Sequence, residues 1–173
     1  MNRLSCRQAL HPLAAALVLG LSGCATGISS HDGKASMTND ADDQAIRQVL
    51  DNYTQSVSSG NQALFESQLL DEKIPFFGLG GTLDPDFKPG LASVQDYASF
   101  RKGVFESGTK FKQRFFNVKI EHDGDLAQAS LNFETIRTES GDGGQGWKTL
   151  QLLKVAGHWK IVSEFYTVYD LKP

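Results

Sequence analysis

The chain has 173 residues, of which 40% are hydrophobic and 21% are charged, and its formal net charge is −3. This length fits one domain with a substantial core, and the acidic balance argues against nucleic acid as a partner, because nucleic-acid binding needs a basic surface. Both cysteines, Cys6 and Cys24, lie near the amino terminus, and only His122 and His158 fall in the later part of the chain. We therefore expect a domain without a disulfide, metal site, cysteine nucleophile or cofactor.

The first 24 residues have the pattern of an export signal. Arg3 and Arg7 give a positive start, residues 13–19 form an apolar run too short to span a bilayer, and residues 21–24 read LSGC. This ending resembles the lipobox of bacterial lipoprotein precursors. The resemblance implies removal of a signal peptide at residues 1–23, lipidation of Cys24 with acyl chains such as palmitate, and stable membrane attachment, since two or more chains make a firm anchor.

The segment of residues 24–41 is small, polar and without periodicity, so we expect a flexible tether between the lipidated cysteine and a domain at 42–173. Ala25 follows the cysteine, in place of the aspartate that resembles an inner-membrane retention signal. This favours a location in the cell envelope, on the periplasmic face of the outer membrane. No basic cluster offers a second contact with anionic lipid. An ordinary secretory signal with a chance cysteine is the alternative for residues 1–23.

The domain is predicted to open with two helices. Apolar residues at positions 46, 49, 50, 53 and 57 share one helical face. Gly60 is expected to end this helix, and Asn61 is suited to cap a second, short helix over 62–70. A strand is expected at 74–79, because this apolar run is short and begins next to a proline.

A glycine- and proline-rich stretch at 80–92 predicts a loop long enough to be the mouth or lid of a pocket. After it, Ser93 and Asp96 resemble a capping box, which predicts a third helix that starts at this point and ends at Gly108.

From residue 111 onward the hydrophobic period changes to two. Four strands are predicted, at 111–122, 126–138, 147–155 and 159–169. Asp123-Gly124, a glycine-rich loop at 140–146 and Ala156-Gly157 would connect them as hairpins, so an antiparallel meander is expected.

Three helices with one strand among them, followed by four long strands that end in Gly157-His158-Trp159-Lys160-Ile161, resemble the nuclear transport factor two-like superfamily. SnoaL-like domains and ketosteroid isomerase belong to it. The resemblance covers residues 42–170 and implies an α+β, cone-like fold, in which three N-terminal helices pack in a strongly curved, mainly antiparallel sheet with a pocket at the open end. Isomerases, dehydratases, cyclases and non-catalytic binders share this fold, so the fold does not determine the function.

The resemblance also suggests where catalytic groups would lie. Ketosteroid isomerase-like members carry an acidic base on the strand after the second helix, but residues 74–79 contain no acid. Tyr53 lies where the oxyanion-binding tyrosine is usually found, although it also continues the apolar helical face. Asp71 and Glu164 are the candidates for a displaced acid, with Tyr53 or Tyr97 as partner. No residue is assigned to catalysis from the sequence, and Tyr53, Asp71 and Glu164 are its candidates.

Alternation along the strands predicts which side chains line the pocket. In the last strand the more apolar face is expected to point inward, and it holds Trp159, Ile161, Ser163, Phe165 and Thr167. Glu164 is expected on the opposite face. In the strand at 126–138, the expected inward set is Ala127, Ala129, Leu131, Phe133 and Thr135, with Glu134 on the solvated face.

The strand at 111–122 allows two assignments. Gln113 and Asn117 would add uncharged hydrogen-bonding groups to an aromatic wall if their face points inward, whereas the other face would present Arg114 to a carboxylate. We favour the first assignment. The predicted ligand-binding residues are then Tyr53, Phe76, Tyr97, Gln113, Phe115, Asn117 and Phe165.

Three functions compete on these grounds. The leading hypothesis is a membrane-anchored lipoprotein whose cone binds a small hydrophobic ligand or a protein partner without catalysis. The second is a SnoaL-like lyase or isomerase that acts on a small hydrophobic substrate by acid–base chemistry. The third is a dimerisation or scaffold module of the cell envelope, which would form a homodimer through apolar residues of the outer sheet face, expected to be Phe116, Val118, Ile120, Leu150, Leu152 and Tyr166.

Overall fold

The structure is a computed structural model that describes residues 32–80 and 93–171. Cys24, the lipobox and residues 81–92 of the loop expected at 80–92 lie outside the described residues, and Gly80 is the last residue of a strand. Within the described ranges, no helix combines the length and the apolar character needed to cross a membrane. The elements in chain order are α1 (Asp32–Ser59), α2 (Gln62–Glu66), β1 (Pro75–Gly80), β2 (Ser93–Asp96), α3 (Tyr97–Val104), β3 (Phe111–Asp123), β4 (Leu126–Arg137), β5 (Gly143–Val155) and β6 (His158–Leu171).

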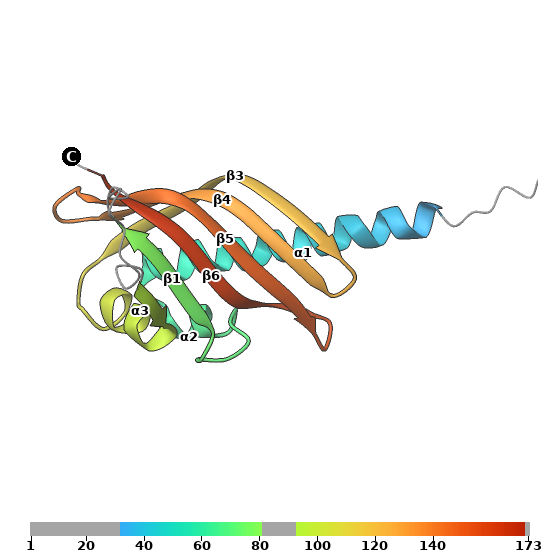
Figure 1. Ribbon diagram of the computed structural model, residues 1–173, viewed down its shortest axis with the longest axis horizontal. Coiled ribbons are helices and arrows are strands. Elements are labelled where there is room, and N and C mark those ends of the chain that lie inside the picture. Colours follow the sequence, from blue (N-terminus) through green and yellow to red (C-terminus); the bar gives the residue numbers. More distant parts are fainter. Residues whose placement is uncertain (1–31, 81–92, 172–173) are drawn as a thin grey trace, which may run out of the picture.

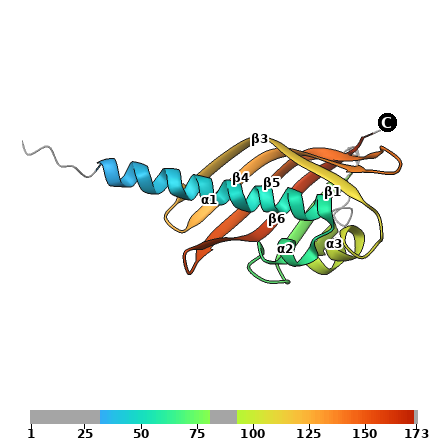
Figure 2. The same cartoon turned by 180° about the vertical axis from the view of Figure 1, so that it is seen from behind.

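The strands form one six-stranded, curved sheet in the order β2-β1-β6-β5-β4-β3. β3 to β6 make an antiparallel meander, and β1 joins it in parallel with β6 and antiparallel with β2. α1 runs along the inner face of the sheet, and α2 and α3 lie at one end of it (Figures 1 and 2). The α+β class, the three helices and the mainly antiparallel sheet predicted from the sequence are therefore confirmed.

The hydrophobic core lies between α1 and the inner face of the sheet. The predicted apolar face of α1 is buried at Ile46, Val49, Leu50, Tyr53 and Val57. The sheet contributes buried apolar residues from β1, β4, β5 and β6, among them Phe76, Ala127, Ala129, Leu131, Phe133, Leu150, Leu152 and Ile161. Removal of this apolar surface from water, at about 25 cal/mol per Å², is the main force that holds α1 in the curve of the sheet.

Helix α1 is longer than the sequence pattern predicts. It begins at Asp32, so residues 32–41, which we expected to belong to the tether, are helical, and this part projects beyond the sheet (Figure 1). No proline interrupts 32–41, and extension of a helix that is already nucleated and packed adds one hydrogen bond for each residue fixed. At the other end the prediction is confirmed: Gly60, at φ +69°, follows the last helical residue, and Asn61 Oδ1 accepts a 3.0 Å hydrogen bond from the Leu64 amide.

Helix α3 starts later and ends earlier than predicted. Residues 93–96 form strand β2 instead of a first helical turn, because their backbone pairs with Pro75–Gly78 of β1. The N-cap is Asp96, whose Oδ1 accepts a 3.0 Å hydrogen bond from the Ser99 amide, and the helix ends at Val104, before Gly108.

The glycine-rich segment expected as a loop at 140–146 is largely strand. β5 begins at Gly143, and Gly143 to Gly146 pair with β4. A side chain at Gly143 would overlap the Thr135 carbonyl oxygen, and one at Gly146 would overlap the Thr167 carbonyl oxygen. Glycine therefore lets β5 approach both neighbouring strands closely, at the end of the sheet where the cavity lies.

Two register shifts, one in β3 and one in β6, reverse the alternation of side chains. In β3 the shift lies between Phe116 and Lys119, with Asn117 at φ +53°. In β6 the register to β5 moves from Ile161 opposite Leu152 to Ser163 opposite Gln151, so Val162 is an extra residue.

The shift at Val162 overturns part of the predicted inward face of β6. Trp159 and Ile161 are buried as expected, but beyond the bulge Glu164 is buried, and Phe165 is 42% exposed against Phe77 on the outer face. A period of two carries over a strand only while the ladder is regular, which is why the sequence pattern gave the wrong face here.

The apolar outer surface expected for a homodimer is also different from the prediction. Leu150 and Leu152 are fully buried, and Val118, Ile120 and Tyr166 pack against the core. The exposed aromatic residues of β5 and β6 are instead Trp147, Phe165 and Tyr169. Homodimer formation stays a prediction.

Candidate functional site

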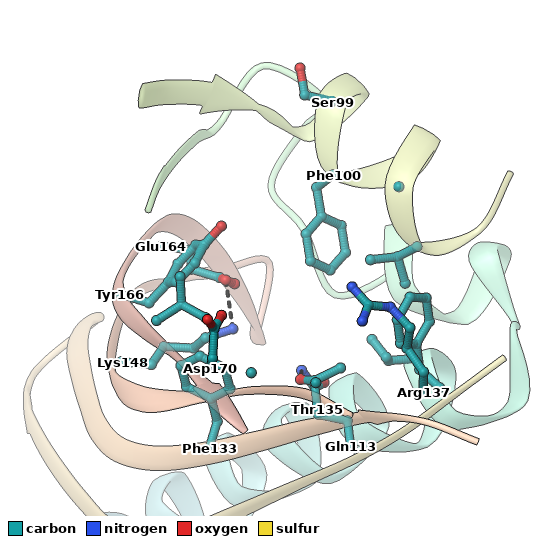
Figure 3. A pocket seen from close by; sticks show the side chains of 17 residues that line it. Ser99, Phe100, Gln113, Phe133, Thr135, Arg137, Lys148, Glu164, Tyr166 and Asp170 are labelled. Atoms are coloured by element: carbon teal, nitrogen blue, oxygen red, sulfur yellow. Dashed lines mark hydrogen bonds and ion pairs between the residues drawn. The ribbon is translucent and has the colours of Figure 1, made fainter. Parts of the chain in front are cut away.

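A cavity of about 380 Å³ opens between α3 and the inner faces of β3 to β6 (Figure 3). Its apolar lining includes Val57, Phe100, Val104, Phe111, Phe133 and Val168. Polar groups enter at a few points, namely Gln113, Thr135, Arg137, Lys148, Glu164, Tyr166 and Asp170. An apolar cavity with a few converging polar groups is the usual form of a small-molecule site.

Three buried polar side chains from distant parts of the chain meet beside this cavity. Lys148 Nζ of β5 donates a hydrogen bond of 2.6 Å to Glu164 Oε1 of β6. The Tyr53 hydroxyl of α1 donates to Glu164 Oε2 at 2.8 Å and accepts from Lys148 Nζ at 3.0 Å. The three groups form a closed ring of hydrogen bonds, in which both carboxylate oxygens of Glu164 have a partner.

The surroundings of this ring are unusual for a charged group. Aromatic rings surround Lys148 Nζ, with centroids at 4.7 Å for Tyr53, 4.9 Å for Phe133, 5.2 Å for Tyr166 and 5.5 Å for Phe115. Ring faces attract a cation, but they do not replace the water that an ammonium group loses on burial.

Burial shifts the pKa values of the groups in this region. It lowers the pKa of Lys148, against the opposing effect of the Glu164 carboxylate. Burial together with the nearby Glu164 charge raises the pKa of Tyr53 well above its usual value and that of Tyr166 to about 12. Both tyrosines therefore keep their protons at neutral pH, and the Tyr53 hydroxyl donates its proton to the hydrogen bond with Glu164.

Gln113 lines the cavity, and its side chain holds a buried acceptor without a partner in the described part of the chain. Its side chain is 9% exposed, and Nε2 donates to Thr135 Oγ1 at 2.8 Å. Within the described ranges, Oε1 has no hydrogen-bond partner. An unpaired buried acceptor costs about 1–3 kcal/mol, so this side chain lowers the stability of the cavity wall.

Arg137 lies across the cavity from the Lys148–Glu164 pair, below α3 (Figure 3). Its guanidinium is 2.5 Å from Asp142 Oδ2, which neutralises part of its charge. The lining of the cavity therefore includes the Lys148–Glu164 ion pair and Arg137, which is paired with Asp142. Neither charge is in large excess.

Comparison with known proteins assigns the fold. The model of the SnoaL-like domain matches residues 46–167. The chain belongs to the SnoaL-like domain family. No curated protein matches it significantly.

Solved structures similar to this SnoaL-like domain include NTF2-like proteins of unknown function. An NTF2-like protein of unknown function from Shewanella baltica is 20% identical with a TM-score of 0.54, over 74% of this chain and 94% of that one. An NTF2-like protein with a cystatin-like fold from Novosphingobium aromaticivorans is 12% identical with a TM-score of 0.59, over 82% and 92%. An NTF2-like protein of unknown function from Silicibacter pomeroyi is 18% identical with a TM-score of 0.54, over 75% and 98%. At these identities the likeness shows the fold alone.

The SnoaL-like domain brings some of the residues named from the sequence together. Tyr53 and Glu164 are hydrogen-bonded, and Gln113 and Glu164 line the same cavity. Phe115 packs beside Tyr53, with ring centroids 5.1 Å apart. Of the two assignments for β3, the one with Gln113 inward is the one found, and Arg114 lies on the outer face, paired with Glu134 at 2.8 Å.

Other candidates lie away from the cavity. Phe76 and Tyr97 are buried in the core, where the Tyr97 hydroxyl donates to Glu66 Oε1 at 2.8 Å. Asp71 is exposed after α2 and accepts a hydrogen bond from the Lys73 amide. Asn117 is exposed at the β3 bulge because the extra residue turns it away from the inner face, and Phe165 lies outside for the same reason in β6.

Lys148 is the main site residue that sequence reasoning missed. A signal was present, since Lys148 shares its strand face with Leu150 and Leu152, but those two leucines were placed on the outer face. The inward position of Glu164 had no comparable signal, because the bulge at Val162 leaves no mark in the residue pattern. In the part of the chain that the structure describes, no three His, Cys, Asp or Glu side chains gather as metal ligands would.

Proposed function

We propose that this SnoaL-like domain binds a small, largely apolar ligand, and that the cavity beside Lys148 and Glu164 is the binding site. The observation that carries the proposal is the cavity of about 380 Å³, with an apolar lining and a few polar side chains that enter it. Apolar burial supplies the affinity of such a site, and the few polar groups orient the ligand.

Binding fits the resting geometry better than acid–base turnover does. A general base needs a free oxygen within reach of the substrate proton. Glu164 Oε1 already accepts a hydrogen bond from Lys148 and Oε2 accepts one from Tyr53. Glu164 is also fully buried, so neither oxygen is exposed to a substrate proton in the described structure.

A substitution at Gly103 tests the binding site directly. Gly103 is in α3, lines the cavity, and a Cβ built on it meets no atom within 4 Å. Gly103→Leu should fill part of the cavity without straining the helix, because leucine favours helix more than glycine does. The exposed neighbour Lys102 gives the matched control, Lys102→Leu, which adds the same side chain outside the cavity.

The measurement is native mass spectrometry after the purified protein is incubated with extracted envelope lipids and metabolites. The wild type and Lys102→Leu should retain a small molecule, and Gly103→Leu should not. Absence of any retained molecule from the wild type, or equal retention by Gly103→Leu, would count against the proposal.

We also propose that Cys24 is lipidated and holds the domain at the periplasmic face of the outer membrane. The support is the sequence LSGC at residues 21–24, after a positive start and a short apolar run. Expression of the full chain in a lipoprotein-processing bacterium, fed an alkyne fatty acid, tests this. Label on the wild type and its loss in Cys24→Ala are expected, whereas an unlabelled, released wild type would favour an ordinary secretory signal.

One observation supports a lyase or isomerase as a second candidate. The Tyr53 hydroxyl is 2.8 Å from Glu164 Oε2, which is within reach for proton transfer between the phenol and the carboxylate. The Tyr166 side chain lines the same cavity. Exchange of solvent deuterium into carbon positions of a retained ligand, followed by NMR, distinguishes the two functions. Exchange that depends on Glu164 would favour the enzyme, and binding without exchange would favour the binding module.

A further inference from the structure

The amine of Lys148 is a nucleophile that ligand binding alone does not require. The Lys148 side chain is 3% exposed and lines the cavity. A buried ion pair is weak evidence for a stabilising role, because a well-packed apolar pair of similar volume is often as stable or more stable. The stability of the domain therefore does not explain why a lysine occupies this place.

Burial of Lys148 makes the neutral, reactive form of its amine more accessible than in an exposed lysine. Desolvation lowers the pKa of Lys148, and a lysine in an apolar pocket is the usual form of an amine that attacks carbonyl groups. Glu164 Oε1, at 2.6 Å from Nζ, is placed to take the proton that the ammonium group must lose. The Tyr53 hydroxyl, which accepts a hydrogen bond of 3.0 Å from Nζ, is the third member of this hydrogen-bonded ring.

A reactive amine also needs room for a carbonyl compound beside it, and the cavity provides this room. Lys148, Glu164 and Tyr166 lie together on one side of the cavity, and Phe100 and Arg137 lie across from them (Figure 3). A carbonyl carbon held near Nζ would have apolar lining for its substituents from Phe133, Val168 and α3. The cavity thus combines an amine, a proton acceptor and room for an organic carbonyl compound.

We propose that Lys148 captures small apolar aldehydes or ketones as a Schiff base in this cavity, an inference that rests on the proposed binding function. Lys148 passes a proton to Glu164, and the freed electron pair of Nζ attacks the carbonyl carbon. A C–N bond forms as the carbonyl π electrons move to oxygen, and the oxygen takes up a proton that the same nitrogen gives up. The C–O bond then breaks, water leaves with the proton returned from Glu164, and a protonated C=N bond remains. No oxidant or reductant is needed, and hydrolysis reverses the reaction.

The test uses benzoylacetone, an apolar β-diketone whose Schiff base rearranges to a conjugated enaminone with a new near-ultraviolet band. The wild type should develop this band and gain the mass of benzoylacetone less one water. Peptide mapping should place the gain on Lys148. We expect the reaction to be faster than with N-acetyl-lysine at the same pH, because each unit of pKa lowering raises the fraction of neutral amine about tenfold.

Two substitutions provide the controls. Lys148→Arg keeps a positive charge beside Glu164 but has no nucleophilic amine of this kind, and it should abolish the band. Lys154→Met changes a lysine of the same strand that pairs with Asp42 and does not line the cavity, and it should leave the band unchanged. If Lys148→Arg does not fold, peptide mapping of the wild type still decides which lysine reacts.

Butylbenzene, which lacks both carbonyl groups, separates this proposal from the binding proposal. Its binding is measured by ligand-observed NMR, with Gly103→Leu as the blocked control. Binding of butylbenzene without a Lys148 adduct of benzoylacetone would overturn the Schiff base and leave the binding function in place. An adduct confined to exposed lysines would overturn it as well. Failure of both probes would count against both proposals.

Discussion

Lys148 Nζ and Glu164 Oε1 are 2.6 Å apart, with their side chains 3% and 0% exposed, although strand alternation places Glu164 on the outer face. The extra residue Val162 in β6 reverses the alternation and brings Glu164 to the inner side of the sheet. A single bulge therefore creates the buried ion pair beside the cavity.

Removal of one charge from this pair should strongly destabilise the domain. Glu164→Gln leaves the Lys148 ammonium buried without a counterion, and we expect a loss of about 3–5 kcal/mol in the free energy of unfolding. Urea denaturation followed by tryptophan fluorescence measures it. Glu134→Gln, which breaks the outer pair with the exposed Arg114, is the matched control and should cost no more than about 1 kcal/mol. Equal losses in both variants would mean that burial does not set the strength of the inner pair.

Replacement of both partners should cost less than the two single changes together. In Lys148→Met with Glu164→Leu, no buried charge is left unpaired, and the double variant should be more stable than Glu164→Gln by at least about 2 kcal/mol. A double-mutant cycle by urea denaturation gives the coupling energy. If the losses in free energy of unfolding of the two single variants add up to the loss of the double variant, the two side chains act independently, and the 2.6 Å contact contributes no coupling energy.

Loss of the Tyr53 hydroxyl should lower the free energy of unfolding, because Glu164 and Lys148 each lose a hydrogen-bond partner. Tyr53→Phe removes one donor to Glu164 and one acceptor for Lys148 in a buried site, so we expect a loss of about 1–3 kcal/mol. Tyr169→Phe, at a half-exposed tyrosine of β6, should change the free energy of unfolding by less than about 0.5 kcal/mol. A stable Tyr53→Phe variant would indicate that water replaces the hydroxyl in the ring.

Tyr166 should make stability depend on alkaline pH. Its pKa is raised to about 12 in the folded domain, whereas an unfolded tyrosine ionises near its ordinary value of about 10. The folded state thus keeps this proton longer, so the contribution of Tyr166 to stability is fully present below about pH 10 and is lost as the pH rises toward about 12.

Comparison of the wild type with Tyr166→Phe isolates this effect from Lys148, whose lowered pKa acts with the opposite sign below its unfolded value. Denaturation at several pH values and tyrosinate absorbance measure it. The difference in stability between the two proteins should shrink between about pH 10 and about pH 12. A difference that stays constant over this interval would show that Tyr166 ionises normally.

Glycines in β5 and α3 should respond in opposite directions to alanine. Gly146→Ala would push a methyl group into the Thr167 carbonyl oxygen, and we expect a loss of at least about 2 kcal/mol. Gly103→Ala meets no atom within 4 Å and lies in a helix, so it should gain about 0.5–1 kcal/mol. Thermal unfolding of both variants tests the pair, and a harmless Gly146→Ala would show that β5 can move away from β6.

Much of the fold could be predicted from local patterns. The apolar face of α1, its end at Gly60, the cap at Asn61 and the hairpins at Asp123-Gly124 and Ala156-Gly157 each depend on residues close together in the chain. The boundaries that failed depend on pairing partners. Residues 93–96 became a strand because β1 lies beside them, and Gly143 to Gly146 became a strand because β4 and β6 do.

The candidate site was less accessible to sequence reasoning. Tyr53, Gln113 and Glu164 were named, but the ring that unites Tyr53 with Glu164 requires Lys148, which the sequence analysis did not consider. Phe165 and Asn117 were assigned to the wrong face because each follows or lies in a bulge.

The α+β class, the order of most elements and the apolar face that α1 buries follow from hydrophobic period and turn chemistry within short windows of the sequence. The meeting of Lys148, Glu164 and Tyr53 beside a cavity depends on how the strands pair in three dimensions. A bulge is a property of two paired strands, because it exists only where the register between them shifts. One extra residue in β6 moves every later side chain to the opposite face of the sheet, and no residue type near Val162 predicts this shift.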